Sequence, residues 1–113
     1  MIGRIDDGTY ATLADTLEDG EEILGAISSW SAALVLTDRR LMIVRQGWRH
    51  RPKTGVRSWP LNRDLMIRIA PRGTSGALII EREHRATTYF VLESDWPDAK
   101  LLVTEARRLS ARS

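Results

Sequence analysis

The sequence predicts a mainly β fold: a seven-stranded antiparallel sandwich or partly open barrel, capped by one C-terminal α-helix and preceded by a short N-terminal helix. Two observations support this. From residue 21 onward, apolar runs of about five to eight residues recur between turn signals, as in antiparallel sheets. After the last run, apolar residues recur three and four apart, as in an amphipathic helix. Short strands joined by turns favour a sandwich or barrel over parallel βαβ units.

The length and composition of the chain fit one globular domain. Its 113 residues suffice for a single core, and we expect an N-terminal segment over 1–20 and the main domain over 21–113. There is no cysteine, which excludes a disulfide framework, thiolate catalysis and a cysteine zinc site. No apolar run approaches the roughly 20 residues that span a bilayer, and the first residues do not resemble a signal peptide. We therefore expect a soluble, cytoplasmic protein.

The first expected element is a short helix over residues 9–18, "TYATLADTLE". Thr9 is a suitable N-cap, and "DG" at Asp19 and Gly20 is a suitable end. The apolar positions of this segment are Ala11, Leu13, Ala14 and Leu17.

Seven strands follow. Their expected ranges are 22–29, 32–37, 40–46, 54–60, 64–70, 76–82 and 87–93. Alternation is clear in the last of them, "TTYFVLE", where Thr88, Phe90 and Leu92 share one face and Tyr89 and Val91 share the other. Period-two patterns of this kind predict strands with two different faces.

The last expected element is a helix within "SDWPDAKLLVTEARRLS" (94–110). Ser94 or Asp95 can cap it, and Pro97 suits its first turn. Its apolar stripe consists of Trp96, Ala99, Leu102, Val103, Ala106 and Leu109. A single helix after seven strands must bury such a stripe on the sheets, so we expect this helix to be part of the core, with Trp96 packed on a sheet.

Several segments together resemble a known family. "EDGEEILGAI" (18–27) followed by "LVLTDRRLMIV" (34–44) resembles the opening of the bacterial pleckstrin-homology (PH)-like domains and their GRAM-like relatives. Residues 60–80 and 89–109 are similar to the family's later strands and closing helix. The resemblance covers about residues 18–110, and its most specific part is the hairpin "TDRR" (37–40).

This resemblance implies a PH-like fold and a general binding role. Some members of this family assemble into oligomers. Phosphoinositide-binding PH domains place basic residues in and around their first strand-to-strand loop. Here that loop, "SSWSAA" (28–33), contains no lysine or arginine. The chain departs from the phosphoinositide-binding members at this loop. Trp30 in this loop is a candidate contact residue.

Charge is distributed unevenly along the chain. Residues 1–38 carry one arginine against eight carboxylates, a net charge of −7, and residues 39–72 carry ten cations against one carboxylate, a net charge of +9. An acidic block followed by a basic block indicates either a polyanion site or two segments that pair, within one chain or between subunits.

The basic block is densest in "RQGWRHRPKTGVRSW" (45–59). The candidate binding residues of this basic hairpin are Arg45, Trp48, Arg49, Arg51, Lys53, Arg57 and Trp59. They can form a solvated hairpin that pairs with the acidic segment 15–22 of the same or another subunit. They can also form a site for an anion or lipid headgroup, or bind single-stranded nucleic acid through cations and stacked aromatic rings.

Residues for catalysis or metal binding are few. The two histidines, His50 and His84, lie in separate charged turns, and no HxH or HxxxH pair is present. "RGTSGA" (72–77) lacks the lysine of a phosphate-binding loop. We expect no enzymatic activity, no cofactor and no metal.

The sequence thus predicts a PH-like binding or scaffolding module that self-associates or binds a protein or an anionic surface. The basic hairpin is its predicted contact surface. The alternative is a nucleic-acid-binding protein that uses the same hairpin.

Overall fold

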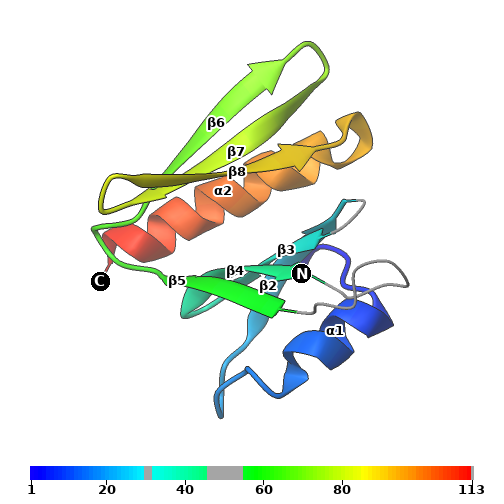
Figure 1. Ribbon diagram of the computed structural model, residues 1–113, viewed down its shortest axis with the longest axis vertical. Helices are drawn as coiled ribbons and strands as arrows, with labels where there is room; N and C mark the ends of the chain where they lie inside the picture. The colour runs from blue at the N-terminus through cyan, green and yellow to red at the C-terminus, as the bar shows by residue number, and fades with distance from the viewer. Residues whose placement is uncertain (30–31, 46–54, 113) are drawn as a thin grey trace.

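Two β-sheets face each other, and the C-terminal helix lies along one side of both (Figure 1). The computed structural model describes residues 1–29, 32–45 and 55–112. The first sheet has the order β1 (Ile2–Gly3), β2 (Ile23–Ser28), β3 (Ala32–Thr37), β4 (Arg40–Arg45), β5 (Gly55–Pro60). The second has the order β6 (Met66–Arg72), β7 (Ser75–Arg82), β8 (Arg85–Val91). The helices are α1 (Asp7–Ala14), the short 3₁₀ helix η1 (Glu93–Asp95) and α2 (Trp96–Ala111).

The seven predicted strands are confirmed as β2 to β8, and each described end lies within two residues of its expected position. All of them pair antiparallel. The sequence did not predict β1, which pairs parallel with β2. This pairing needs a glycine, because Gly3 has a φ of 69° and a Cβ there would lie 2.0 Å from the Ala26 carbonyl oxygen.

The main core lies between the two sheets and α2. The predicted apolar stripe of α2 is confirmed: Ala99, Leu102, Val103 and Ala106 are fully buried. Each fully buried leucine or valine contributes roughly 1.5–3 kcal/mol, so α2 is integral to the fold. Trp96 packs on the second sheet as expected, since its ring lies directly over Gly76.

The N-terminal helix begins earlier and ends earlier than predicted. It starts at Asp7, and its N-cap is Asp6 instead of Thr9. The Asp6 carboxylate accepts hydrogen bonds from the Thr9 backbone N–H at 2.7 Å and from the Thr9 hydroxyl at 3.0 Å. Asp6 thus satisfies the free backbone amide of Thr9 in the first turn, and Thr9 lies inside the helix instead of capping it. Leu13 of α1 is fully buried against the outer face of the first sheet.

The outer face of the second sheet is different. On β8, Tyr89 and Val91 point into the core, whereas Phe90 is 68% exposed. Met66 at the start of β6 is 57% exposed. No helix among the described residues is both long and apolar enough to cross a bilayer.

Candidate functional site

The structure describes three of the seven predicted contact residues. Arg45 ends β4, and Arg57 and Trp59 lie on β5. The other four, Trp48, Arg49, Arg51 and Lys53, lie outside the described residues, as do Trp30 and His50.

Arg57 and Trp59 share one face of β5. The Arg57 guanidinium carbon lies 5.0 Å from the centre of the Trp59 ring, within the range of a cation–π interaction. Trp59 itself is only 7% exposed and belongs to the main core. It can therefore take part in a contact surface only through Arg57, which is exposed.

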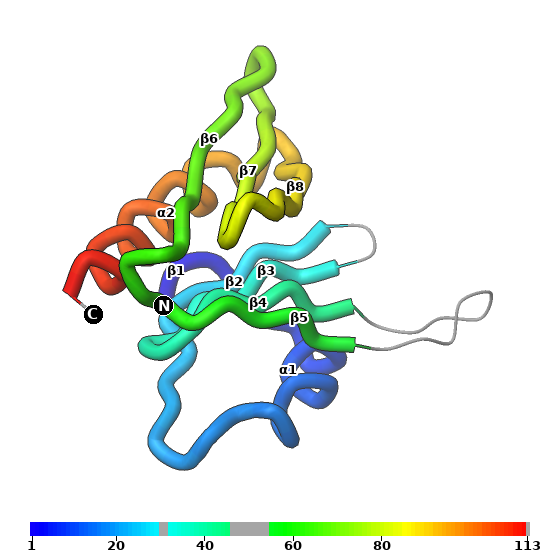
Figure 2. The backbone as a smooth tube through the Cα atoms, turned by 60° about the vertical axis from the view of Figure 1, so that its left-hand side comes forward, coloured from blue at the N-terminus to red at the C-terminus, as the bar shows by residue number. Residues whose placement is uncertain are grey.

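Arg45 lines a cleft of about 360 Å³ at the open corner between the two sheets. Figure 2 shows the ends of β2 and β3 beside β8 at this corner. The corner is tied together by Tyr89, whose hydroxyl lies 3.1 Å from the Ala32 carbonyl oxygen and 3.3 Å from that of Ile27. We call this site the β4–β8 corner and define it by Arg45, Phe90 and Leu92.

Among the described residues, the β4–β8 corner combines one cation, Arg45, with exposed apolar surface. Arg45 is exposed, and no carboxylate is among the described residues that line the cleft. Phe90 and Leu92, on the rim, are 68% and 45% exposed. Such a surface can bind an anionic group of a partner and bury apolar surface of that partner at the same time.

The described residues at the corner provide no catalytic constellation. The Ser29 hydroxyl donates to the Ala32 carbonyl oxygen, so it faces a backbone acceptor instead of a general base. His84 lies in the turn between β7 and β8. Within residues 1–29, 32–45 and 55–112, no group of three histidines or carboxylates is arranged to hold a metal ion.

The acidic segment 15–22 pairs with the turn between β3 and β4. Glu21 and Arg40 form an ion pair at 2.8 Å, and Glu18 and Arg39 form another at 2.8 Å. The predicted pairing of acidic and basic blocks therefore occurs within the chain, at Arg39 and Arg40. Among the described residues, Arg45 and Arg57 take no part in an ion pair.

Glu21 is the centre of a hydrogen-bond network that fixes the "TDRR" turn. Its side chain has no exposed surface. It accepts hydrogen bonds from Arg40 Nε at 2.9 Å and from the Thr37 hydroxyl at 2.6 Å. Burial alone would raise the pKa of the Glu21 carboxyl, but these hydrogen bonds outweigh it and lower the pKa to about 2. The most specific motif of the sequence thus has a structural role: it fixes the acidic segment to the turn between β3 and β4.

Phe90 and Leu92 are not among the contact residues predicted from the sequence. The alternation in "TTYFVLE" placed both on one face, but it did not decide which face was buried. No residue in this segment decides it, because both faces carry apolar or aromatic side chains: Phe90 and Leu92 on one, Tyr89 and Val91 on the other.

Comparison with known proteins supports the fold. Neither protein-family models nor curated proteins gave a significant match to this sequence. Among solved structures, the chain is similar to a pleckstrin homology domain from Shewanella amazonensis SB2B, with a TM-score of 0.74 and 19% sequence identity, over 93% of this chain and 90% of that one. The similarity confirms that the chain adopts the PH-like fold which the sequence resemblance implied.

Proposed function

We propose that the protein is a non-enzymatic binding module that self-associates through unlike surfaces. In this proposal the β4–β8 corner and Arg57 of one copy contact the acidic surface of another copy. That acidic surface consists of the exposed carboxylates Asp15, Asp19 and Glu22, between α1 and β2. The PH-like fold supports a binding role in general terms.

The observation that carries the proposal is that opposite charges remain unpaired in two separate regions. Glu18 and Glu21 are neutralised within the chain, whereas Asp15, Asp19 and Glu22 form no ion pair among the described residues. Arg45 and Arg57 likewise form no ion pair among the described residues. Contacts between two different patches repeat from copy to copy, so they produce rings or chains.

Light scattering after size-exclusion chromatography tests this proposal. At low salt we expect a mass above the 12.8 kDa of one chain, and at high salt a return toward that value, since screening weakens contacts between exposed charges. The double variants Arg45→Glu/Arg57→Glu and Asp15→Arg/Glu22→Arg should each be smaller at low salt. An equimolar mixture of the two should recover a larger species, because each retains the patch that the other has lost.

Arg72→Glu is the matched control, because Arg72 is an exposed arginine at the end of β6. It should assemble as the unmodified chain does. A monomeric mass at every salt concentration, or no recovery on mixing, would reject the proposal.

The alternative, binding of single-stranded nucleic acid, uses the same basic hairpin. The burial of Trp59 removes one of its two tryptophans from base stacking. Fluorescence anisotropy with a labelled oligonucleotide over a salt series tests this alternative, for which we expect a steep loss of affinity with salt. Absence of binding at low salt would eliminate it.

A further inference from the structure

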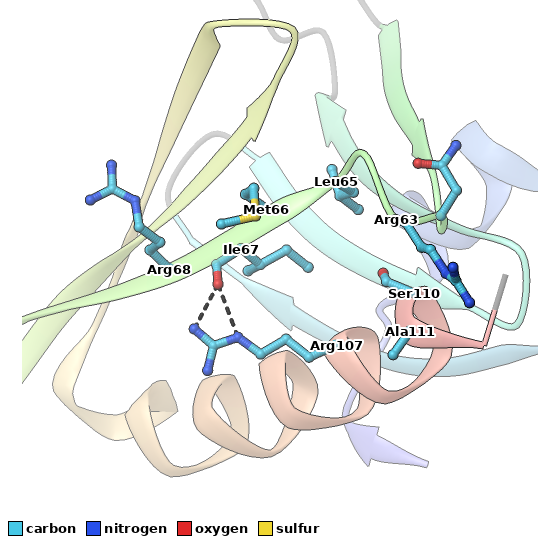
Figure 3. Close-up of a pocket in the computed structure, with 9 residues that line it drawn as sticks. Arg63, Leu65, Met66, Ile67, Arg68, Arg107, Ser110 and Ala111 are labelled. Atoms are coloured by element: carbon cyan, nitrogen blue, oxygen red, sulfur yellow. Dashed lines mark hydrogen bonds between the residues drawn. The ribbon is translucent and has the colours of Figure 1, made fainter.

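A second hollow lies on the other edge of the second sheet, between the start of β6 and the last turns of α2 (Figure 3). We call it the β6–α2 groove. Its volume is about 340 Å³. The residues that matter to its chemistry are Arg63, Leu65, Met66, Ile67, Arg107 and Ser110. Because β6 and β8 are opposite edges of the sheet, the groove is separate from the β4–β8 corner.

Ser110 gives the groove an unsatisfied polar group. The residue is 7% exposed, and its hydroxyl is buried without a hydrogen-bond partner among the described residues. In Figure 3 this hydroxyl points from α2 toward the space beside Arg63 and Leu65. A buried hydroxyl without a partner is unfavourable, so an oxygen atom of a ligand would be stabilised there.

The charges around the groove are of one sign. Of the described residues that line it, three are arginines and none is a carboxylate. Arg68 pairs with Glu81, and Arg107 is engaged with the backbone of β6. Arg63 is exposed and forms no ion pair among the described residues. It is therefore the cation available to a ligand, and it favours a carboxylate.

The backbone of β6 has a free edge along the groove. Among the described strands, β6 pairs only with β7. The Ile67 carbonyl oxygen accepts hydrogen bonds from Arg107 Nε at 3.0 Å and Nη2 at 2.6 Å. The polar backbone groups of Ile67 therefore point away from β7, and by the alternation of an antiparallel pair so do those of Ile69. Pro71, the next outward position, has no N–H to offer. The Leu65 N–H already donates to the Asn62 carbonyl oxygen, and Arg107 occupies the Ile67 carbonyl oxygen. The outward groups left for pairing are therefore the Ile67 N–H and those of Ile69.

We propose that the β6–α2 groove binds an extended peptide segment of a partner protein, with apolar side chains and at least one carboxylate. The backbone of this segment pairs with β6 at the Ile67 N–H and at Ile69, as in other strand additions to a sheet edge. Its apolar side chains cover Met66, which is 57% exposed. Its carboxylate meets Arg63 and the Ser110 hydroxyl. This site does not depend on the proposed self-association.

Selection from a phage library of random dodecapeptides tests the groove. The unmodified chain is the target, after depletion of the library on the Arg63→Glu variant. Arg63 is exposed, so this variant should fold normally. We expect enriched peptides that alternate apolar residues and contain more aspartate and glutamate than the input. No clone that distinguishes the two proteins, or clones without this acidic excess, would overturn the proposal.

Titration of the ¹⁵N-labelled chain with the most enriched peptide then locates the contact. We expect saturable shifts of the Ile67 and Ile69 amide signals. Affinity should fall about tenfold in Arg63→Glu, which exchanges an attractive charge for a repulsive one. It should fall severalfold in Ser110→Ala, which removes the hydroxyl alone. Arg85→Glu is the matched control and should bind equally, because Arg85 is an exposed arginine at the start of β8, on the opposite edge of the sheet. Shifts confined to the β4–β8 corner, or equal binding by Arg63→Glu, would contradict the proposal and leave self-association untouched.

Discussion

The outer faces of the two sheets differ in what covers them. On the first sheet, α1 lies across the outer face, and Leu13 is fully buried against Val35 and Met42 (Figure 1). On the second sheet, Phe90 and Met66 of the outer face remain more than half exposed. One outer face is therefore a second small core, and the other is surface. Apolar residues of the first stabilise the fold, whereas those of the second are available for contacts.

The largest expected loss of stability comes from truncating Leu13, which packs α1 against the first sheet. Leu13→Ala removes a fully buried side chain and should lower the free energy of unfolding by about 3 kcal/mol. Urea denaturation followed by tryptophan fluorescence measures it. Phe90→Ala is the matched truncation on the other sheet. Equal losses in the two variants would contradict the distinction between the faces.

The second-largest effect is expected at the ion pair between Glu21 and Arg40, which holds the connection from α1 to β2 in place. Glu21→Gln removes a buried charge that pairs with Arg40, and should cost roughly 2–3 kcal/mol at pH 7. The folded pKa of Glu21, about 2, lies below its ordinary value of 4.5. The carboxylate therefore stabilises the fold above pH 4.5, and this contribution is lost as the pH falls toward 2.

Urea titrations at pH 7 and pH 3 test this pH dependence. The gap between the unmodified chain and Glu21→Gln should narrow at the lower pH. Glu18→Gln is the control, because the Glu18 side chain is 63% exposed in its ion pair, and exposed pairs contribute about 1 kcal/mol or less. A gap between the unmodified chain and Glu21→Gln that is constant with pH would disprove the role assigned to the carboxylate.

A smaller effect is expected where the two sheets are tied together. Tyr89→Phe keeps the buried ring but removes the hydroxyl that reaches the Ala32 and Ile27 carbonyl oxygens. We expect a loss of about 1 kcal/mol, the usual net contribution of one hydrogen bond. The same urea assay measures it, and a loss as large as that of Leu13→Ala would show that the hydroxyl has a further partner.

The smallest effect is expected on the open face. Phe90→Ser replaces a mostly exposed ring and should change the free energy of unfolding by less than about 0.5 kcal/mol. Thermal denaturation checks this expectation. A large loss would mean that another element covers this ring in solution.

The sequence predicted the seven longer strands and α2 because each of these segments is long enough to show a hydrophobic period. It could not predict β1, since two residues have no period and their pairing depends on the position of Ala26. The N-cap of α1 was misassigned because Asp6 and Thr9 are both good capping residues. Only the backbone around Thr9 shows which of them accepts the hydrogen bond.

The candidate site was less predictable than the fold. The sequence placed Arg45, Arg57 and Trp59 in one hairpin, but it did not show that Trp59 is buried while both arginines are exposed. Charge blocks indicated pairing without naming the partners, which proved to be Arg39 and Arg40. Ser110 gave no signal in the sequence, because a serine near the end of a helix is ordinary until its surroundings are known.

The two residues of β1 also protect the edge of β2 from pairing with strands of other molecules. Without them, β2 would expose a row of unpaired backbone groups, which is the usual starting point for aggregation by strand pairing. A bulky side chain at Gly3 would push β1 away from the Ala26 carbonyl while most of the core stayed intact. The consequence of such a change would be insoluble material formed from molecules that are otherwise folded.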